Sequence, residues 1–469
     1  MSSSFPKDWS ISTIEDTVEI LDNQRKPVNA TERAKRIGNI PYYGATGLAG
    51  YIDDFIFDDE LILLGEDGAP FFDKSKDVAF KINGKTWVNN HAHVLKAKKI
   101  TTNNFLLYYL NQFDYNGFVG GTTRLKLTQT DLKRIPFPLP PLPEQERIVA
   151  KLDALFAQHE SMKKALECIP QLLKDFRQQV LTHAITGKFT SSYEYQPIVQ
   201  EIISDRKEWY KKQLLHAKPK KIVEKVNEDK SFLEFYLQKK TDISFIEEIS
   251  AKKDNALKAG PFGSSLKKEF YVQEGYKIYG QEQVIKGDSK YGDYYIDEAK
   301  YKELQSCAID KGDLLISLVG TIGKTLVIPA DFEKGIINPR LLKFSFHEKI
   351  NPYYIQIYLQ SEIANKFLSK NSHGGTMDVL NMGILKKLPI PIPSTPEQQE
   401  IVSRVESLFS KAESIEKRYQ ILKEKIDNLP QAILHKAFKG ELVPQLPTDG
   451  DAKDLLEEIL KLKKEVKKK

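Results

Sequence analysis

The sequence predicts a mixed α/β protein in which two α/β globules are separated by two long helices that pack together as a coiled coil. Two observations support this fold class. The segment from Leu132 to Phe156 returns as Leu385 to Phe409, with an offset of 253 residues, no gap and 12 of 25 positions identical. After each copy, apolar residues continue in steps of four and three. So long a period indicates a duplicated domain rather than a solenoid, and a duplicated chain favours a pseudo-twofold arrangement.

The two repeats carry matching heptad seams. In the first half the seam residues are Ile148, Leu152, Leu155, His159, Met162, Leu166, Ile169, Leu173, Phe176 and Val180. In the second half they are Ile401, Val405, Leu408, Ala412, Ile415, Tyr419, Leu422, Ile426, Leu429 and Ile433. Each helix would span about 40 residues, or about 60 Å. Packing of each helix on its own globule is the alternative, but so narrow a stripe favours a helical partner.

Proline and glycine mark where these helices begin and end. Prolines at every second position favour an extended, polyproline-like strand before each helix: Pro136, Pro138 and Pro140, then Pro389, Pro391 and Pro393. Pro143 and Pro396 suit the first helical turn, and Gly187 and Gly440 suit C-caps. Pro170 and Pro430 fall inside the helices at positions that do not correspond, and each is expected to kink its helix.

The order of these signals predicts six segments. They are a globule at 1–131, a proline strand and long helix at 132–190, a helical linker at 191–240, a second globule at 241–384, a second proline strand and helix at 385–445, and a basic amphipathic helix at 446–469.

Composition indicates the class of protein. At 469 residues, 41% hydrophobic and 29% charged, the chain is expected to be a soluble protein of two or more domains. We expect a cytoplasmic protein, since no signal peptide or membrane span is apparent. The only two cysteines, Cys168 and Cys307, fall in different predicted domains, which argues against a disulfide framework or a cysteine zinc site. Lysine and arginine cluster at 206–225 and in the tail, where they could attract polyphosphate or form solvated helix faces.

Most catalytic motifs are missing from the sequence. It has no Asn-Pro-Pro-Tyr or Asp-Pro-Pro-Tyr motif and no Gly-x-Ser-x-Gly elbow. The segment VGTIGKT resembles a phosphate-binding loop but has Leu318 where the first glycine is required. His91 and His93 could ligate a metal, yet no further His or Cys lies nearby, so hydrogen bonding or packing is favoured and no metal is expected.

Turn-rich loops with polar and aromatic residues remain as candidate contacts to DNA. The candidates are Tyr42, Tyr43, Gly44, Thr46, His91, His93, Arg124 and Lys126 in the first globule, and Gly260, Phe262, Gly263, Ser264, Ser265, Lys267, Lys268, Gln281, Glu282, Gln283 and Arg340 in the second. Arg and Lys pair with guanine, Gln with adenine and Glu with cytosine, while Ser and Lys hold phosphates. For any single residue, ordinary surface chemistry is the alternative.

These residues resemble a known family. The repeated PLPEQERIVAKLD and PSTPEQQEIVSRVE segments, the long helix after each, and the globule motifs IPYYGATG and GPFGSSL look like the specificity subunit of type I restriction–modification systems. The resemblance covers nearly the whole chain. It implies that the two helices pack antiparallel and set a spacing, and that each globule reads one half of a split, asymmetric DNA site.

The resemblance also implies the partners. They are double-stranded DNA, two modification subunits that methylate adenine N6 with S-adenosylmethionine, and restriction subunits that use ATP and Mg²⁺. The chain itself would bind no cofactor and would not be an enzyme. A fused relative that cuts on both sides of its site shares this recognition module. A protein-binding scaffold and a nuclease or methyltransferase in its own right are the alternatives, and the missing motifs speak against the last.

Overall fold

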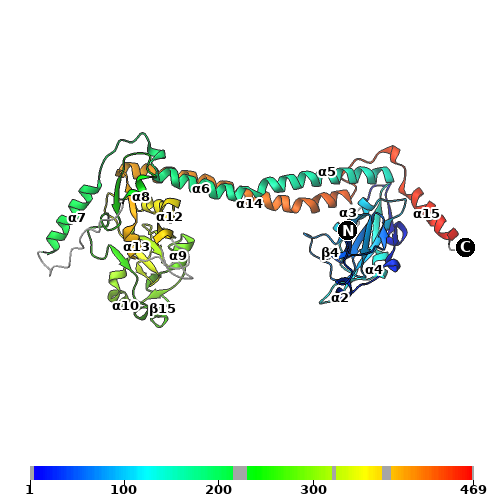
Figure 1. Cartoon of the computed structure of the whole chain (residues 1–469), viewed down its shortest axis with the longest axis horizontal. Coiled ribbons are helices and arrows are strands. Elements are labelled where there is room, and N and C mark those ends of the chain that lie inside the picture. Colours follow the sequence, from blue (N-terminus) through cyan, green and yellow to red (C-terminus); the bar gives the residue numbers. More distant parts are fainter. Residues whose placement is uncertain (1–4, 215–229, 319–323, 372–381, 467–469) are drawn as a thin grey trace. The chain divides into compact units, whose positions relative to one another are not determined.

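The computed structural model describes residues 5–214, 230–318, 324–371 and 382–466. The chain forms two compact units: unit 1 comprises Met1–Cys168 and Tyr419–Lys469, and unit 2 comprises Ile169–Arg418. Each unit therefore combines one globule with parts of both long helices (Figure 1). This division cuts across the segments expected from the sequence, and the two units are described separately below.

The globule of unit 1 contains two four-stranded sheets. One has the order β2 (Val18–Ile20), β9 (Ala92–Ala97), β6 (Leu61–Gly65), β7 (Ala79–Ile82), with antiparallel neighbours throughout. The other has the order β4 (Gly47–Ile52), β3 (Ile40–Gly44), β8 (Lys85–Val88), β5 (Phe57–Asp58). In this sheet β3 runs antiparallel to β4 but parallel to β8.

The globule of unit 2 also contains two four-stranded sheets. One sheet has the order β14 (Leu257–Ala259), β21 (Leu341–Phe344), β18 (Leu314–Ser317), β19 (Thr325–Val327), again antiparallel. The other has the order β15 (Tyr271–Val272), β17 (Tyr295–Ile296), β16 (Tyr276–Tyr279), β20 (Gly335–Ile337). Its β16 is antiparallel to β17 and parallel to β20. The two globules thus share strand connections that their divergent sequences do not reveal.

Both proline segments form short β-strands. β12 (Pro136–Leu139) pairs antiparallel with β1 (Ser10–Thr13), and β22 (Pro389–Ile392) pairs antiparallel with β13 (Asp242–Phe245). Each pair is a two-stranded sheet, so the side of the proline strand that lacks N–H donors needs no second neighbour. The expected polyproline-like stretch is therefore extended but is hydrogen-bonded to the start of its own globule.

The two long helices differ in continuity. The first is interrupted: α5 (Leu142–Glu167) ends at Cys168, and α6 (Ile169–Ile185) begins one residue before Pro170. The second, α14 (Thr395–Ala437), stays continuous through Pro430. Gly187 and Gly440 follow the helix ends in the left-handed region, with φ of 82° and 75°, as expected of C-terminal glycines. Proline thus breaks only the first helix.

The continuity of α14 has a physical cause. Pro430 has no N–H, so the carbonyl of Ile426, four residues earlier, loses its intrahelical donor. The buried His159 on α5 contributes its ring nitrogen Nε2 to that carbonyl at 2.9 Å. This contact lies within unit 1, and it shows that α5 and the end of α14 lie side by side there (Figure 1).

The ends of the long helices belong to the globule cores. In unit 1, Phe438 at the end of α14 packs with its ring 5.1 Å from Phe105 and 5.3 Å from Tyr109 of α3 (Asn103–Gln112). In unit 2, Val180 and Ile185 of α6 lie in one core with strands of the second globule. Each globule is therefore completed by the end of the long helix from the other repeat.

Burial along the predicted seams is uneven. The buried seam residues are Ile148, Leu152, His159 and Ile426 and Ile433 in unit 1, and Leu173, Val180, Ile401, Val405 and Ala412 in unit 2. Those partly buried are Leu155, Leu166, Ile169, Leu408, Tyr419 and Leu429. Met162, Phe176, Ile415 and Leu422 are exposed. The seam is thus closed near the globules and open at these four positions, although the heptad pattern predicted that they belong to the seam.

A pair of shorter helices extends the repeat. α7 (Val199–Leu214) follows α6, and α15 (Ala452–Val466) follows α14; their first residues again lie 253 positions apart. Val199 and Ala452 are both buried in their units. The linker and the tail are therefore corresponding elements. Among the described residues, no helix is long and apolar enough to cross a membrane.

Candidate nucleic-acid interface

Both globules contain the same hydrogen-bonded turn, which we call the asparagine turn. It comprises residues 88–91 in unit 1, at the end of β8, and residues 337–340 in unit 2, at the end of β20. In each unit the turn leads from the strand that pairs parallel with its neighbour into the central strand of the other sheet. The turn therefore joins the two sheets of its globule.

In unit 1, three hydrogen bonds fix the turn. The Asn89 N–H donates to the carbonyl of Tyr43 at 3.1 Å, which extends the pairing of β3 with β8. The Asn89 side-chain oxygen accepts from the N–H of His91 at 2.8 Å. The carbonyl of His91 accepts from the N–H of Glu66 at 2.8 Å. Asparagine suits this position because its short side chain can bond the backbone two residues on.

In unit 2, the same three bonds recur. The Asn338 N–H donates to the carbonyl of Tyr279 at 2.8 Å. The Asn338 side-chain oxygen accepts from the N–H of Arg340 at 2.9 Å, and the Arg340 carbonyl accepts from the N–H of Leu318 at 3.0 Å. His91 and Arg340 are thus structurally equivalent residues on the same backbone support.

Glycine allows close approach at both turns. A Cβ built on Gly280 would lie 2.9 Å from Nδ2 of Asn338, and one on the corresponding Gly44 would lie 3.6 Å from Nδ2 of Asn89. In unit 2 a second strand end approaches, since a Cβ on Gly260 would lie 1.8 Å from the Asn338 carbonyl oxygen. No other residue type fits at Gly260, so the motif beginning there is held directly against the asparagine turn.

Charged side chains surround the turn of unit 1. His91 Nδ1 lies 3.1 Å from Asp67 Oδ1, although the contact is not aligned as a hydrogen bond. Asp67 also forms an ion pair with Arg124, and Lys126 Nζ lies 3.4 Å from a carboxylate oxygen of Glu66. Arg124 follows the short strand β10 (Val119–Gly120), which pairs with β11 (Lys126–Leu127). The structure thus brings the candidates His91, Arg124 and Lys126 together.

The turn of unit 2 carries a different set. Gln281, at the start of α9 (Gln281–Lys286), donates from Nε2 to the Ser317 hydroxyl at 2.8 Å. Its side-chain oxygen accepts from Nη1 of Arg340 at 3.4 Å. Ser317 ends β18, so three strand or helix ends meet at this point. The candidates Gln281, Arg340 and Gly260 therefore converge, and Ser317 and Asn338 are additions that the sequence did not suggest.

The remaining candidates divide by exposure. Those exposed are Thr46, Phe262, Ser264, Lys267, Lys268 and Glu282, and those partly buried are Tyr43 and Ser265. Phe262 is 88% exposed although the residues on either side of its loop, Pro261 and Leu266, are buried. Gly263 begins the short 3-10 turn η3 (Gly263–Ser265). Phe262 is thus an apolar ring presented by an anchored loop.

Four candidates are wrong as DNA contacts, because the fold encloses them. Tyr42 is 1% exposed and donates its hydroxyl to the Val28 carbonyl at 3.0 Å. Gln283 caps α9 by accepting from the Gly280 N–H, and His93 has no exposed surface. Gly44 is also buried. Their polarity serves internal hydrogen bonds or close packing, which a sequence alone does not distinguish from surface chemistry.

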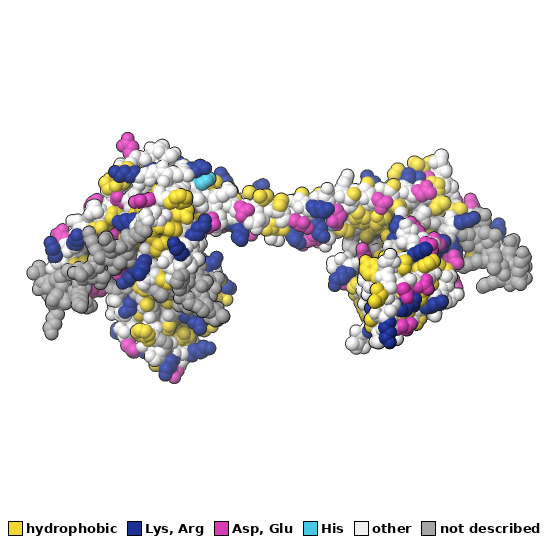
Figure 2. All heavy atoms as spheres, in the orientation of Figure 1, with side chains coloured by type: hydrophobic (Ala, Val, Ile, Leu, Met, Phe, Trp, Pro, Cys, Tyr) yellow, Lys and Arg dark blue, Asp and Glu magenta, His cyan; other side chains and the backbone are white. Residues whose placement is uncertain are grey.

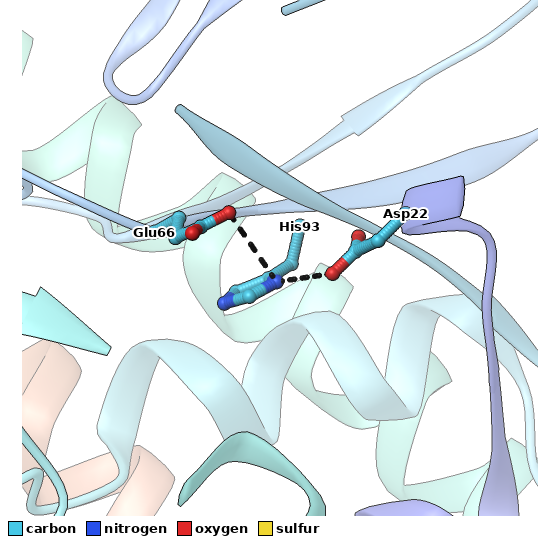
Figure 3. A group of neighbouring side chains, drawn as sticks. All are labelled: Asp22, Glu66 and His93. Carbon is cyan, nitrogen blue, oxygen red and sulfur yellow. Dashed lines mark hydrogen bonds and ion pairs between the residues drawn. The ribbon is translucent and has the colours of Figure 1, made fainter. Parts of the chain in front are cut away.

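His93 lies in a buried ionic cluster (Figure 3). Its Nδ1 is 2.6 Å from Asp22 Oδ2 and its Nε2 is 3.0 Å from the Leu127 carbonyl. The His93 ring thus lies between two hydrogen-bond acceptors, the Asp22 carboxylate and the Leu127 carbonyl. Burial raises the pKa of Asp22, but the hydrogen bond and charge of His93, the Val94 N–H and the Arg25 charge outweigh it and leave that pKa below 3.8.

The cluster has the composition of a metal site but also contains an arginine. Asp22, Glu66 and His93 bring three potential ligand atoms together. Arg25 Nη1, however, bonds Glu66 at 2.7 Å and the Ala92 carbonyl at 2.6 Å, so a guanidinium supplies the positive charge. Hydrogen bonding, which the sequence favoured over metal ligation for His93, describes this arrangement.

A second acid–histidine group, in unit 2, is arranged similarly. Asp205, His347 and Glu348 lie close together, and Lys252 Nζ is 3.1 Å from Asp205 and 3.7 Å from Glu348. Burial lowers the pKa of His347. Lys252 thus supplies the positive charge in this group, as Arg25 does in the cluster of unit 1.

Some predicted features lie outside the described residues. They are most of the VGTIGKT segment (319–323), and Lys218, Lys220, Lys221 and Lys225 of the basic linker. On the visible face of each unit, acidic and basic side chains are interspersed rather than segregated (Figure 2).

Comparison with known proteins identifies the family. The family described as "Type I restriction modification DNA specificity domain" matches the chain twice, at residues 6–171 and 260–424, which together make up more than half of its length. The chain belongs to this family.

Curated relatives agree with the assignment. The putative type I restriction enzyme specificity subunit of Haemophilus influenzae is 28% identical over 437 residues, covering 88% of this chain and 94% of the relative. The EcoBI specificity subunit of Escherichia coli is 31% identical over 338 residues, covering 72% of this chain and 64% of its own.

Solved structures share the fold. The HsdS subunit from Thermoanaerobacter tengcongensis matches with a TM-score of 0.54 at 17% identity, over 93% of this chain and 98% of that one. A chain from a study of type I restriction–modification complex assembly matches with a TM-score of 0.57 at 15% identity, over 93% and 99%.

The repeated Glu-Gln pair near the end of each specificity domain has a structural role that the sequence did not reveal. Gln145 accepts from the Thr101 hydroxyl at 2.7 Å and donates to the carbonyls of Ile100 and Pro140, both at 2.9 Å. Gln398 likewise accepts from the Asn351 N–H at 2.7 Å and donates to the Pro393 carbonyl at 2.9 Å. Each glutamine fastens its long helix to its own globule.

The neighbouring glutamates reach the other repeat. Glu144 accepts from Trp9 Nε1 at 3.0 Å and from Gln445 Nε2 at 2.8 Å, and Gln445 follows the end of α14. Glu397 accepts from Lys239 Nζ at 2.9 Å and from the Thr190 hydroxyl, and Thr190 follows the end of α6. The two glutamates thus hold the chain where it leaves the opposite long helix.

Proposed function

We propose that this chain is the DNA-reading subunit of a type I restriction–modification complex, with each asparagine turn on the face that its unit presents to DNA. The observation that carries this proposal is the repeated turn itself. Equivalent hydrogen bonds, from the backbone N–H to the side chain of the asparagine two residues earlier, support His91 in unit 1 and Arg340 in unit 2. A constant support with different side chains is what two readers of unlike sequences require.

The DNA site is therefore split and asymmetric. The recognition domains are residues 1–131 and 241–384, and each reads one half. The exposed residues Thr46, Arg124 and Lys126 in unit 1, and Ser264, Lys267 and Lys268 in unit 2, supply further polar and phosphate contacts.

The two long helices pack antiparallel, place the two units about a pseudo-twofold axis and set the gap between the half-sites. Support comes from contacts inside each unit: His159 with Ile426 in unit 1, and Arg177 with Glu416 at 2.8 Å in unit 2. As the first helix advances from 159 to 177, its partner residue falls from 426 to 416. Falling numbers are the signature of an antiparallel pair.

This role of the helices can be tested by changing their length. Seven residues inserted in both helices, within 160–170 and 417–425, preserve the heptad seam and add about 10.5 Å. The gap in the recognised site is expected to grow by roughly three base pairs, with both half-sites unchanged. Altered half-sites with an unchanged gap would refute the spacing role.

Partner subunits supply the chemistry. Two modification subunits dock on the helices, where Met162, Phe176, Ile415 and Leu422 offer exposed apolar surface. They carry S-adenosylmethionine and methylate adenine N6, and restriction subunits carry ATP and Mg²⁺. This chain contributes recognition without catalysis or a bound cofactor, and it acts in the cytoplasm, where the DNA is.

A methylation map tests the proposed function. The chain is co-expressed with the modification subunit encoded beside it in a host without DNA methylation, and native DNA is sequenced for N6-methyladenine. One split motif with two unlike halves and a fixed gap is expected. If a co-purifying and catalytically intact modification subunit produced no methylation, a protein-binding scaffold would be the better account.

A further inference from the structure

We propose that the third residue of each asparagine turn determines one base of its half-site, and that Arg340 reads a guanine in the half-site of unit 2. This inference rests on the proposed function and names the residue and base that it leaves open. It starts from the equivalence of His91 and Arg340, which lie in turns held by the same three hydrogen bonds.

The backbone of Arg340 is held on both sides. Its N–H donates to Asn338 and its carbonyl accepts from Leu318, so the main chain enters the turn with little freedom. The Gly260 backbone lies directly against Asn338 and supports the turn from a third direction. A side chain that starts from a fixed backbone loses less conformational entropy on binding, which favours a specific contact over a diffuse one.

The guanidinium of Arg340 retains most of its donors. Arginine offers five N–H donors, and among the described residues this guanidinium makes one hydrogen bond, the 3.4 Å contact to the Gln281 side chain. Gln281 is itself oriented by Ser317. The neighbour is a neutral amide, so it directs the guanidinium without cancelling its charge.

His91, the counterpart of Arg340 in unit 1, has a charged neighbour instead of a neutral one. His91 lies beside the carboxylate of Asp67, which also pairs with Arg124. A carboxylate that is paired with an arginine therefore lies beside His91, whereas a neutral amide lies beside Arg340. The corresponding positions thus present different donors, and we expect them to read different bases.

Guanine is the base that fits Arg340. In the major groove its O6 and N7 are two adjacent acceptors, which match two parallel N–H groups of one guanidinium. Adenine presents an acceptor beside a donor, and the donor would oppose a guanidinium N–H. Gln281, whose amide could suit adenine, is engaged with Ser317 and Arg340 and serves to position the arginine.

Arg340→Ala tests the assignment by native-DNA mapping of N6-methyladenine. Loss of a bidentate contact is expected to lower discrimination at one guanine of one half-site by about 5- to 150-fold. The motif should become degenerate at that position and stay intact elsewhere. His91→Ala should relax one position in the other half-site.

Two controls keep the result interpretable. Lys302→Ala removes an exposed cation of α10 (Glu298–Glu303) that pairs with Glu298, away from the turn, and should leave the motif unchanged. Co-purification with the modification subunit and an unchanged circular dichroism spectrum show that each variant is folded.

The outcomes separate this inference from the proposed function. If the unaltered chain directs a split motif but Arg340→Ala only lowers methylation uniformly over an unchanged motif, Arg340 contacts phosphate and the guanine assignment is wrong. If the unaltered chain directs no methylation, the proposed function itself fails.

Discussion

The strand that leaves the asparagine turn is supported by a charged cluster in unit 1 and by an apolar core in unit 2. On β9, His93 is enclosed by Asp22, Glu66 and the Leu127 carbonyl. The corresponding residue on β21 is Leu342, since His93 pairs with Leu64 of β6 and Leu342 pairs with Ile316 of β18. Leu342 is 1% exposed in an apolar core. The same backbone arrangement can therefore be stabilised either by an ionic cluster or by an apolar core. Different substitutions should therefore destabilise the two units.

The largest expected effect on the free energy of unfolding comes from truncating the side chains at these two equivalent positions to alanine. His93→Ala removes the closest partner of the buried Asp22 carboxylate and should destabilise unit 1 by about 3–5 kcal/mol. Leu342→Ala should destabilise unit 2 by about 2–5 kcal/mol through a cavity. The measurement is urea unfolding followed by tryptophan fluorescence in a Trp209→Phe background, which leaves only Trp9 and Trp87, both in unit 1.

In that background, His93→Ala should shift the fluorescence midpoint and Leu342→Ala should leave it nearly in place. Loss of unit 2 is followed separately by hydrogen exchange of its peptides. A His93→Ala variant as stable as the unaltered chain would show that the ionic cluster is dispensable and that the comparison is wrong.

The next effect concerns the long helices, where the repeats also differ. His159 bonds the carbonyl that Pro430 leaves without a donor, whereas the residues 253 positions away are Ala412 and Arg177. His159→Ala should destabilise unit 1 by about 1–3 kcal/mol, because it leaves a buried carbonyl unsatisfied. In a Pro430→Ala background, residue 430 regains its N–H and the same substitution should cost less. A double-mutant cycle without coupling would contradict this explanation.

A smaller contrast is expected from acid. The folded pKa of Asp22 is lowered, so its contribution to unit 1 is present above 3.8, the ordinary pKa, and is lost as pH falls below that value. Burial raises the pKa of Asp313 in unit 2, and hydrogen bonds from Ser345 and the Asp310 N–H, with the charges of Lys253 and Lys343, offset only part of it. Unit 2 should therefore gain stability from Asp313 as pH falls from its raised pKa towards 3.8.

Asparagine variants isolate these contributions. Stability is measured against pH for Asp22→Asn and Asp313→Asn. Asp22→Asn should remove part of the stability that unit 1 loses as pH falls. Asp313→Asn should remove the stability that unit 2 gains over its own pH range. If both variants changed the dependence of unfolding free energy on pH in the same direction, the pKa values of Asp22 and Asp313 would not be shifted in opposite directions.

The smallest effect on stability is expected at Phe262. Its ring is 88% exposed, so Phe262→Ala should change the free energy of unfolding by less than about 0.5 kcal/mol. Removal of an apolar ring beside the asparagine turn should nevertheless weaken DNA binding, as measured by fluorescence anisotropy with a duplex carrying the site. Unchanged affinity would remove Phe262 from the interface.

The sequence predicted those features that depend on local signals. The 253-residue repeat, the start of each long helix near Pro143 and Pro396, and the terminal Gly187 and Gly440 all follow from nearby residues. The continuity of α14 could not be predicted, because Pro430 is tolerated through His159, which lies 271 positions earlier in the chain.

Long-range packing also limited prediction of the site. Tyr42, His93 and Gln283 have the chemistry of base contacts, and only the fold reveals that they are enclosed. Asn89 and Asn338 were missed because their partners Tyr43 and Tyr279 lie on distant strands. A signal does exist, since a Tyr-Gly pair precedes a Val-Asn or Ile-Asn pair in both halves, but the intervening lengths differ.

The central claim is that each unit reads its own half of the DNA site. Exchange of residues 241–384 for the corresponding segment of another specificity subunit, followed by native-DNA mapping of N6-methyladenine, tests it most directly. The account predicts that one half-site changes while the other half-site and the gap stay the same. A change in both half-sites, or in the gap, would contradict it.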